Sequence, residues 1–330
     1  MAFPMKLRAP LKDYLWGGTR LKTQYFKRTP DLPTVAESWE LSCHPDGYSV
    51  ISSGEFAGQT LSDYLKEHPE DLGSRAKKDE RFPILIKLID AARDLSVQVH
   101  PDNAYALEKE HELGKMEAWY IIDCKPGAKL IYGFEHEISK EEFARRIEDQ
   151  TLLDVVHQVE VHPGDLYFVE AGTLHAIGEG ILLAEIQQSS NVTYRVYDYG
   201  RLGADGKPRA LHIDRALDVT RRAPAVVHSL PGEPIELEGA EIRPLVDCPY
   251  FQTALWTVED VLDWTVGEES FLHLLVLDGG LELDYGFGSL GLIPGDSVFL
   301  PAMSGEFELI GEGRILATEL GKAEQERENR

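Results

Sequence analysis

The chain has 330 residues, 43% of them hydrophobic, and its 57 acidic and 33 basic side chains give a formal net charge of -24. This length and apolar content predict globular domains with buried cores. The negative charge, without a long run of Lys or Arg, argues against nucleic-acid binding, and any anionic ligand would need a local cluster of basic side chains.

Turn-forming residues and short amphipathic patterns predict many strands and few helices. The 18 prolines and 29 glycines are scattered, which is typical of short strands joined by turns. Short helices are predicted at Leu61–Leu65 and Leu211–Val219. A third begins at Ser139-Lys140-Glu141-Glu142, a capping-box pattern, and Phe143 and Ile147 give it an apolar stripe.

The segment Leu95–His100 is predicted to be a strand with one polar face. Because side chains alternate along a strand, Ser96, Gln98 and His100 point to one side, and Leu95, Val97 and Val99 point to the other. Such a row would be ordinary on an exposed edge strand. It becomes informative when polar side chains from other strands converge on it.

The next strand, Lys115–Ile122, directs an acidic side chain inward. Its alternation places Lys115, Glu117, Trp119 and Ile121 on one face. Trp119 and Ile121 favour burial, so Glu117 is expected to be buried with them. A buried carboxylate is costly unless a cation or several donors compensate it, which makes Glu117 a candidate metal ligand.

A turn followed by a strand occurs twice in the chain. Segment 163–171 reads Pro-Gly-Asp-Leu-Tyr-Phe-Val-Glu-Ala, and segment 294–302 reads Pro-Gly-Asp-Ser-Val-Phe-Leu-Pro-Ala. Apolar strands at 119–123 and 274–278 precede the two copies. This order of strands and turns is the layout of a cupin, a small double-sheet jelly roll. We therefore predict a mainly β fold with two cupin (double-stranded β-helix, jelly-roll) barrels and a few short helices.

The repeat divides the chain into two predicted units. Residues 1–222 form an N-terminal catalytic cupin domain with N-terminal strands and short helices, and residues 235–320 form a C-terminal cupin-like domain. The proline-rich stretch 223–234 is the expected linker. Residues 321–330 have no apolar side chain larger than alanine and are expected to be a disordered tail.

His175 completes a set of three candidate metal ligands. It ends the segment Ala171-Gly172-Thr173-Leu174-His175, directly after the first Pro-Gly-Asp strand, where cupins supply their last ligand. With His100 and Glu117 it offers two imidazoles and a carboxylate from three strands of one barrel. This donor set suits Zn²⁺ or another first-row metal, and Gln98 is the expected fourth ligand.

The second unit lacks these ligands. Alignment of the two units places Leu272 opposite Glu117 and Glu306 opposite His175. We therefore expect the C-terminal domain to be metal-free and to serve packing or assembly.

Several segments resemble motifs of the type I mannose-6-phosphate isomerases (phosphomannose isomerases) of the cupin superfamily, in particular their compact bacterial branch. The motifs follow the family order over residues 10–220 and are Tyr14–Gly18, Glu37–Ser42, Leu95–Asp102, Lys115–Glu117, Gly172–Ala176, Glu185 and Ser189–Arg195. The resemblance implies one Zn²⁺ in the N-terminal cupin, held by Gln98, His100, Glu117 and His175. It also implies active-site roles for Arg195, Lys115 and Glu185.

The implied activity is the interconversion of mannose 6-phosphate and fructose 6-phosphate, an aldose-ketose isomerisation through a cis-enediolate. The metal would polarise the carbonyl, and Glu185 or a metal-bound water would move the proton. Arg195 and Lys115 would bind the anionic sugar, and Ser96, on the metal-facing side of its strand, can donate to the phosphate. In the alternative without a catalytic role, Arg195 pairs with Asp198 or Glu185, and Lys115 is a solvated strand residue.

Two other functions are compatible with the sequence. A bicupin dioxygenase usually binds iron with three histidines and one glutamate, and Gln98 in place of a histidine speaks against it. A non-enzymatic sugar-phosphate-binding sensor would have kept the barrel and lost turnover.

Cysteine usage and hydropathy indicate the compartment. Cys43, Cys124 and Cys248 lack the spacing of a disulfide framework or a zinc site and are expected to be reduced thiols. No signal-peptide-like stretch opens the chain, and no segment approaches the ~20 apolar residues needed to span a bilayer. We expect a cytoplasmic enzyme that binds a small-molecule sugar phosphate, with no nucleic-acid or membrane partner, as a monomer or weak homodimer.

Overall fold

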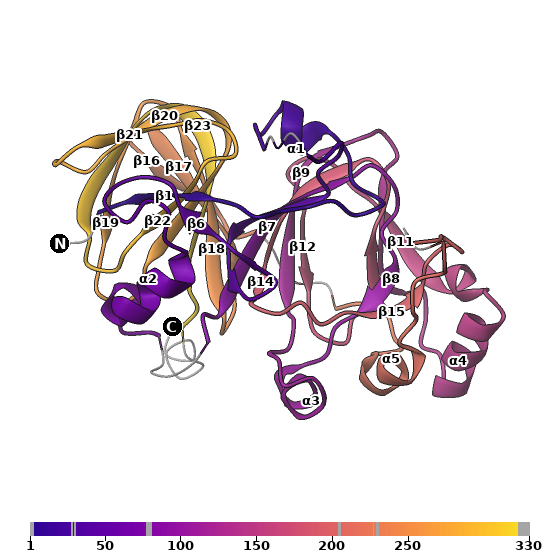
Figure 1. Cartoon of the computed structure of the whole chain (residues 1–330). Helices are drawn as coiled ribbons and strands as arrows, with labels where there is room; N and C mark the ends of the chain where they lie inside the picture. Colours follow the sequence, from indigo (N-terminus) through magenta and orange to yellow (C-terminus); the bar gives the residue numbers. More distant parts are fainter. Residues whose placement is uncertain are drawn as a thin grey trace.

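The computed structural model describes residues 3–27, 29, 31–76, 81–203, 206–226, 228 and 231–322. Their strands form two lobes side by side, with the C-terminal strands in one lobe and helices α4 and α5 at the outer side of the other (Figure 1). The mainly β fold predicted from the sequence is confirmed. Within the described ranges no helix is long and apolar enough to cross a membrane. Residues 323–330 of the predicted tail, and 227, 229 and 230 of the predicted linker, lie outside the described residues.

The central layer is a six-stranded antiparallel sheet whose two middle strands are buried on both faces. Its order is β12-β9-β14-β7-β3-β2, with bounds Leu166–Val169, Glu117–Cys124, Ile181–Gln188, Ile84–Ala91, Glu37–Leu41 and Leu11–Lys12. Every residue of β7 and β14 is buried. Because side chains alternate along a strand, one set faces the C-terminal lobe and the other faces a second sheet.

That second sheet has five antiparallel strands and carries helices on its outer side. Its order is β11-β10-β13-β8-β15, with bounds Val156–Glu160, Lys129–Phe134, His175–Ile177, Val97–Val99 and Tyr194–Tyr197. Val97, Val99 and Tyr194 pack outward with Phe143 of α4 and Ala216 of α5. Their alternating neighbours therefore point into the space between the two sheets.

The C-terminal lobe contains a ten-stranded antiparallel sheet that includes two N-terminal strands. β1 (Met5–Arg8) pairs with β22 (Ser297–Leu300) and with β6 (Val50–Ile51), a pairing that the division at residue 222 did not foresee. The remaining strands are β16 (Ile235–Leu237), β17 (Ala240–Asp247), β18 (Phe251–Val258), β19 (Val261–Val266), β20 (Leu272–Asp284), β21 (Ser289–Leu292) and β23 (Gly305–Leu320). A small hairpin joins β4 (Cys43–His44) and β5 (Gly47–Tyr48). The described sheets are not closed rings of paired strands, so two separate closed barrels are not confirmed.

Three helices occur close to their predicted positions. They are α2 (Leu61–Glu67), α4 (Lys140–Glu148) and α5 (Ile213–Val219). At α4 the Ser139 side chain accepts a hydrogen bond from Glu142 N, and the predicted apolar stripe is buried. The short helices α1 (Arg20–Thr23) and α3 (Asn103–Lys109), and the 3-10 turns Pro69–Leu72 and Leu152–Asp154, were not predicted.

The two Pro-Gly-Asp turns have the same backbone hydrogen bonds. Gly164 N donates to Ile121 O, and Ile121 N donates to Asp165 O. Gly295, Val276 and Asp296 form the same pair of bonds. Both glycines have a positive φ, 93° and 88°, which favours glycine at that position. The repeat seen in the sequence is therefore also a structural repeat of strand and turn.

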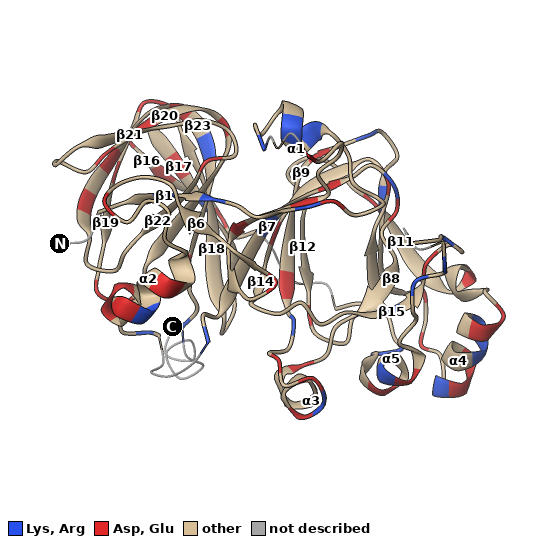
Figure 2. Cartoon of the chain, in the orientation of Figure 1, with Lys and Arg blue, Asp and Glu red and all other residues tan. Residues whose placement is uncertain are grey.

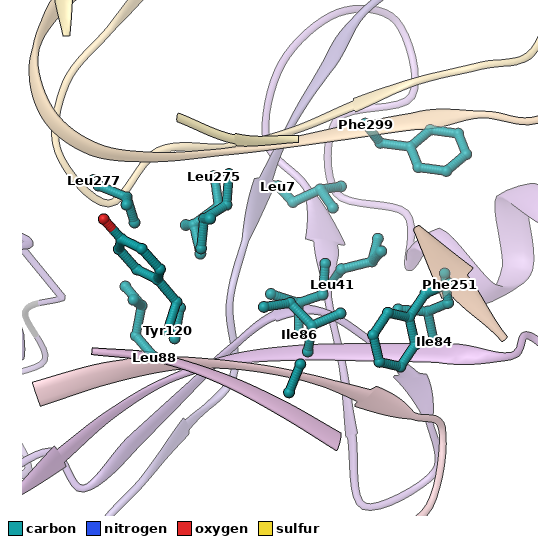
Figure 3. Packing of buried hydrophobic residues seen from close by; sticks show 14 of the residues in the cluster. Leu7, Leu41, Ile84, Ile86, Leu88, Tyr120, Phe251, Leu275, Leu277 and Phe299 are labelled. Atoms are coloured by element: carbon teal, nitrogen blue, oxygen red, sulfur yellow. The ribbon is translucent and has the colours of Figure 1, made fainter. Parts of the chain in front are cut away.

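The two lobes share one hydrophobic core (Figure 3). From the central sheet it contains Ile84, Ile86, Leu88 and Tyr120, and from the C-terminal lobe Phe251, Leu275, Leu277 and Phe299. These residues lie on the side of the central sheet that faces the C-terminal lobe. The shared core packs against one face of the central strands. The polar side chains on the opposite face are therefore held in fixed positions.

Candidate active site

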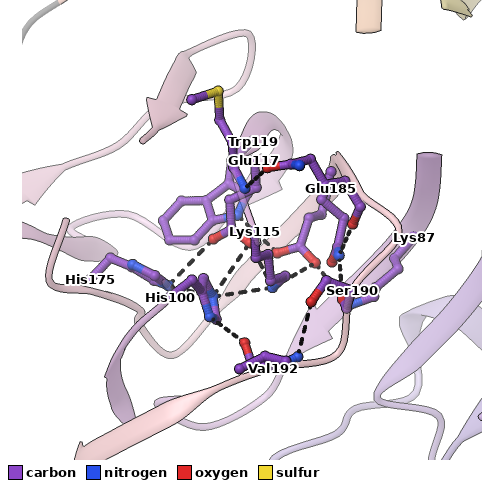
Figure 4. Close-up of polar contacts among 12 residues, drawn as sticks. Lys87, His100, Lys115, Glu117, Trp119, His175, Glu185, Ser190 and Val192 are labelled. Carbon is purple, nitrogen blue, oxygen red and sulfur yellow. Dashed lines mark hydrogen bonds and ion pairs between the residues drawn. The ribbon is translucent and has the colours of Figure 1, made fainter. Parts of the chain in front are cut away.

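Three buried side chains meet between the central and the five-stranded sheets (Figure 4). His100 follows β8, Glu117 begins β9 and His175 begins β13. The Nε2 atoms of His100 and His175 are 3.2 Å apart. Oxygens of Glu117 lie 3.6 Å from His100 Nε2 and 3.3 Å from His175 Nε2. The structure thus brings together the three residues that the sequence analysis selected.

The histidine tautomers favour a cation between these groups. Nδ1 of His100 lies 2.8 Å from Val192 O, and Nδ1 of His175 lies 2.8 Å from Thr173 O. Each ring therefore donates from Nδ1 to a carbonyl and presents the lone pair of Nε2 to the other ring. Burial lowers the pKa of both histidines, that of His175 to about 4, so both are neutral at pH 7. Two lone pairs and a carboxylate at this distance repel one another unless a cation lies close to them. Lys115 Nζ, 3.2 Å from His100 Nε2 and 2.7 Å from Glu117 Oε2, supplies part of this positive charge. A metal ion between the two rings would also bind the lone pair of His175 Nε2.

Glu117 is a buried carboxylate short of hydrogen-bond donors. Its Oε2 lies 2.7 Å from Lys115 Nζ, yet neither oxygen accepts a hydrogen bond of regular geometry from the described residues. Burial, followed by the negative charge of Glu185, raises the pKa of Glu117. A metal cation would stabilise the ionised carboxylate and offset this penalty. Two neutral imidazoles and one carboxylate fit Zn²⁺ or a similar divalent ion.

A row of charged side chains crosses the central sheet beside this cluster. Glu185 of β14 is the direct pairing neighbour of Lys87 on β7 and of Trp119 on β9. Lys87 Nζ donates to Glu185 Oε1 at 2.9 Å, and Trp119 Nε1 donates to Oε2 at 3.0 Å. Burial opposes ionisation of Glu185, but Lys115 and Lys87 outweigh it and lower its pKa. Burial alone would lower the pKa of Lys87. The negative charges of Glu185 and Glu37 raise this pKa instead, so the lysine stays charged.

The buried charges of this network do not cancel. Its members are Glu37, Glu117, Glu185, Lys87 and Lys115, joined by nitrogen–oxygen distances between 2.7 and 3.9 Å. Three carboxylates and two ammonium groups sum to a formal charge of -1. A divalent cation would change this sum to +1, which favours an anionic ligand.

A polar cavity of about 300 Å³ borders the cluster. Its wall includes Ser96, Gln98, Lys115, Glu185 and Arg195, all of which the sequence analysis had named. Gln98 is paired directly with His175 on one side and Arg195 on the other, so the three side chains leave the sheet on the same face. Three larger hollows, of about 1020, 600 and 460 Å³, are lined by none of these residues. The chemistry therefore favours the smaller cavity.

Arg195 lacks the ion pair, and Lys115 lacks the solvent exposure, that were expected of them without a catalytic role. Arg195 Nε donates to Ser96 Oγ at 3.1 Å, and Nη1 donates to Ala210 O at 3.0 Å. In the described part of the chain no carboxylate forms an ion pair with Arg195; Asp198 pairs with Arg201 and Arg209 instead. Lys115 is only 4% exposed, so it is not a solvated strand residue.

The structure corrects one detail of the polar strand and adds three residues to the site. Leu95 precedes β8 and lines the cavity, instead of facing outward with Val97 and Val99, because the regular alternation starts only at residue 97. The sequence patterns indicated no role for Lys87 or Arg209, and Glu37 was named only as part of the motif Glu37–Ser42. Lys87 stands in the apolar run Ile-Leu-Ile-Lys-Leu-Ile, and a lone charge in a buried strand was a usable signal. Arg209 lies in a loop without periodicity, so no pattern pointed to it.

Relatives of known class match the whole chain. Residues 5–119 match the family model for the catalytic domain of type I phosphomannose isomerase, and residues 241–319 match that for the mannose-6-phosphate isomerase cupin domain. The chain is 39% identical to a mannose-6-phosphate isomerase of Streptococcus mutans, over 96% of this chain and 98% of that protein. It is 37% identical to the mannose-6-phosphate isomerase ManA of Bacillus subtilis, over 96% and 99%.

Solved structures show the same fold. The crystal structure of a mannose 6-phosphate isomerase from Bacillus subtilis superposes with a TM-score of 0.90 at 36% identity, over 96% of this chain and 99% of that chain. A putative mannosephosphate isomerase from Archaeoglobus fulgidus, 23% identical, has a TM-score of 0.78 over 98% and 99% of the two chains.

Proposed function

Because this chain belongs to the type I phosphomannose isomerase family, we propose that it interconverts mannose 6-phosphate and fructose 6-phosphate in the cavity beside His100, Glu117 and His175. The observation that carries the proposal is the convergence of these three buried side chains beside a cavity whose wall includes Arg195, an arginine that forms no ion pair with a carboxylate of the described residues. The relatives support the class of reaction, and the geometry supports this location for it.

We assign one Zn²⁺ ion to His100, Glu117 and His175, with Gln98 as the fourth ligand. The facing Nε2 lone pairs and the donor-poor carboxylate of Glu117 support this assignment. When bound, such an ion supplies Lewis-acid chemistry that stabilises negative charge on a substrate oxygen, as expected for a route through a cis-enediolate. The carbonyls of Val192 and Thr173 hold the two rings in the orientation that binding requires.

Lys115 and Glu185 act together at the oxygens next to the reacting carbons. The isomerisation moves a proton between C1 and C2 and develops negative charge on the substrate oxygens. Lys115 lines the cavity and is placed to donate to such an oxygen. Glu185 lies 3.7 Å from Lys115 Nζ, and its two oxygens already accept from Lys87 and Trp119. We therefore propose that Lys115 stabilises the negative charge on the substrate oxygen by donating a hydrogen bond, and that Glu185 orients it.

Arg195 and Ser96 bind the phosphate of the substrate. Both line the cavity, and Ser96 Oγ accepts from Arg195 Nε, which fixes the guanidinium at the wall. In a chain of net charge -24 this arginine supplies the local positive charge that an anionic sugar requires.

We also propose a domain architecture and a cellular location for the chain. We propose two cupin units, because the strand and Pro-Gly-Asp turn recur with the same hydrogen bonds and the family models assign a cupin domain to residues 241–319. We further propose a cytoplasmic enzyme that works as a monomer or weak homodimer. The free thiols of Cys43 and Cys124 are compatible with a reducing compartment.

A coupled assay tests the proposed activity. Purified protein is mixed with mannose 6-phosphate, and the formation of fructose 6-phosphate is followed together with oxygen consumption. We expect turnover within the usual enzymatic range of ~1 to 1000 per second, without oxygen uptake. Oxygen uptake without sugar interconversion would instead identify a dioxygenase, and binding without turnover would identify a sensor.

A further inference from the structure

A second arginine lies beside Arg195 at the wall of the cavity. Arg209 follows β15 in the chain, and both guanidinium groups line the same cavity as Lys115 and Gln98. The backbone brings Arg209 back to this point, since His212 N donates to Arg195 O and Arg195 N donates to His212 Nδ1. The segment after β15 therefore runs alongside that strand and returns a second cation to the site.

Asp198 fixes the orientation of Arg209. Arg209 Nε donates to Asp198 Oδ2 at 2.7 Å, and Nη2 donates to Oδ1 at 2.5 Å, a bidentate pair. The same carboxylate accepts from Arg201 Nη2. Asp198 is 7% exposed, so its buried carboxylate can hold these loop arginines in place. Such a fork holds a guanidinium in one plane and leaves its three other N–H donors for another acceptor.

The charges of this group are unbalanced in favour of an anion. Arg201 and Arg209 share the carboxylate of Asp198, and Arg195 lies beside them with Ser96 as its side-chain partner, so these three arginines and one carboxylate have a formal charge of +2. Burial and then the like charge of Arg209 lower the pKa of Arg195, which indicates that these two cations are close enough to repel each other. A bound phosphate carries a charge of about -1.5 to -2 at pH 7 and would relieve this repulsion.

We propose that Arg209 is a second phosphate-binding arginine of the active site, placed beside Arg195 by Asp198 as its positioning residue. This inference rests on the proposed function, because it takes the phosphate of the sugar substrate as the ligand. It assigns a specificity role to a loop residue: the pair of arginines selects phosphorylated sugars over neutral ones. Arg201 binds the same carboxylate but does not line the cavity, so its role is to hold the loop.

The test compares Arg209→Gln with Arg201→Gln, a matched control that removes a partner of the same Asp198. In the metal-loaded enzyme we expect Arg209→Gln to raise KM for mannose 6-phosphate about 10- to 100-fold and to change kcat less than about threefold, the range of a lost charge-assisted hydrogen bond. The inhibition constant of inorganic phosphate should rise by a similar factor. Arg201→Gln should leave that constant within about twofold, and Arg209→Lys should restore part of the affinity.

Two outcomes would overturn the inference. In the first, Arg209→Gln and Arg201→Gln change the inhibition constant of phosphate by the same factor, or Arg209→Gln changes it less. The other is a fall in kcat at unchanged KM, which would mean a structural or chemical role. Asp198→Asn should weaken phosphate binding less than Arg209→Gln does, because it loosens the guanidinium without removing it. If the wild-type enzyme does not isomerise mannose 6-phosphate, the proposed function fails, while direct titration with inorganic phosphate still tests Arg209.

Discussion

Single hydrogen bonds hold the charged side chains of the site in fixed positions. Trp119 donates to Glu185, and the carbonyls of Val192 and Thr173 accept from the two histidine rings. None of these groups changes charge in the reaction. Their contribution is to orient the groups that contact metal and substrate, as outer partners of a metal site usually do.

The indole of Trp119 offers a direct test of this role. In Trp119→Phe, Glu185 Oε2 loses a buried donor, which should cost about 1–3 kcal/mol of unfolding free energy. We also expect kcat to fall about 10-fold, because Glu185 no longer holds Lys115 in place. Steady-state kinetics and urea unfolding measure the two effects. Trp256→Phe, a buried change in the C-terminal lobe, is the control that should lower stability and leave kcat unchanged.

His273 provides a pH-dependent prediction far from the catalytic chemistry. It is fully buried, its Nε2 lies 2.8 Å from Ser297 Oγ, and burial lowers its pKa to about 3. Between about pH 6.5 and pH 3 the unfolded chain binds a proton at this position and the folded chain does not, so stability is lost as the pH falls.

Replacement of His273 by Gln removes this proton linkage. From pH 6.5 to pH 4.5, the unfolding free energy of the wild type should decrease by about 2–3 kcal/mol more than that of His273→Gln. Urea unfolding at the two pH values measures the difference. Parallel decreases in both proteins would show that His273 is protonated in the folded state.

Secondary-structure elements bring these residues together through their alternation. On β7 and β14 one set of side chains packs in the shared core, and the other set carries Lys87 and Glu185 to the cavity. The helices are less involved, since α4 packs on the outer face of the five-stranded sheet. Changes at a helix cap should therefore separate stability from activity.

Ser139→Ala removes the N-cap of α4 and tests this separation. The Ser139 hydroxyl accepts from Glu142 N at 3.0 Å, so its loss should cost about 1 kcal/mol. Kinetic constants should stay unchanged. Thr60→Ala, which removes the corresponding cap of α2, should behave in the same way. A large fall in kcat for either variant would mean that these helices support the site more directly than their positions indicate.

Alternation is also what made part of the site predictable. It directed Glu117 inward next to Trp119 and placed His100 on the polar face of its strand, and the position after the first Pro-Gly-Asp strand indicated His175. The sequence of one strand does not determine which strands pair with it. The neighbouring positions of Lys87, Glu185 and Trp119 could therefore be found only from the structure. The turn repeat was readable because the Pro-Gly-Asp chemistry is local, whereas the pairing of β1 with β22 joins residues almost 300 positions apart.

At the scale of the whole molecule, one core supports both lobes. Leu275 of the C-terminal lobe packs with Ile86 and Tyr120 of the central sheet. Leu275→Ala should lower the unfolding free energy by about 2–5 kcal/mol. Because both lobes depend on this core, they should unfold together, and far-UV circular dichroism and tryptophan fluorescence should report the same midpoint. Two separate midpoints would show that the lobes are independent domains.

Because the whole molecule is strongly acidic, an anionic substrate needs local positive charge at the site. The chain carries a net charge of -24, and acidic residues lie on elements of both lobes (Figure 2), yet Arg195, Arg209 and Lys115 all line its cavity. A metal ion would add to this positive field and complete the site for a sugar phosphate.

The central claim is that turnover depends on a metal held by His100, Glu117 and His175. The measurement is the mannose 6-phosphate coupled assay on untreated, chelator-treated and zinc-restored protein, with metal content determined for each sample. We expect chelation to reduce activity on the order of 1000-fold, zinc to restore it, and His100→Ala to lack both metal and activity while remaining folded. Full activity in protein shown to contain no metal would contradict the account.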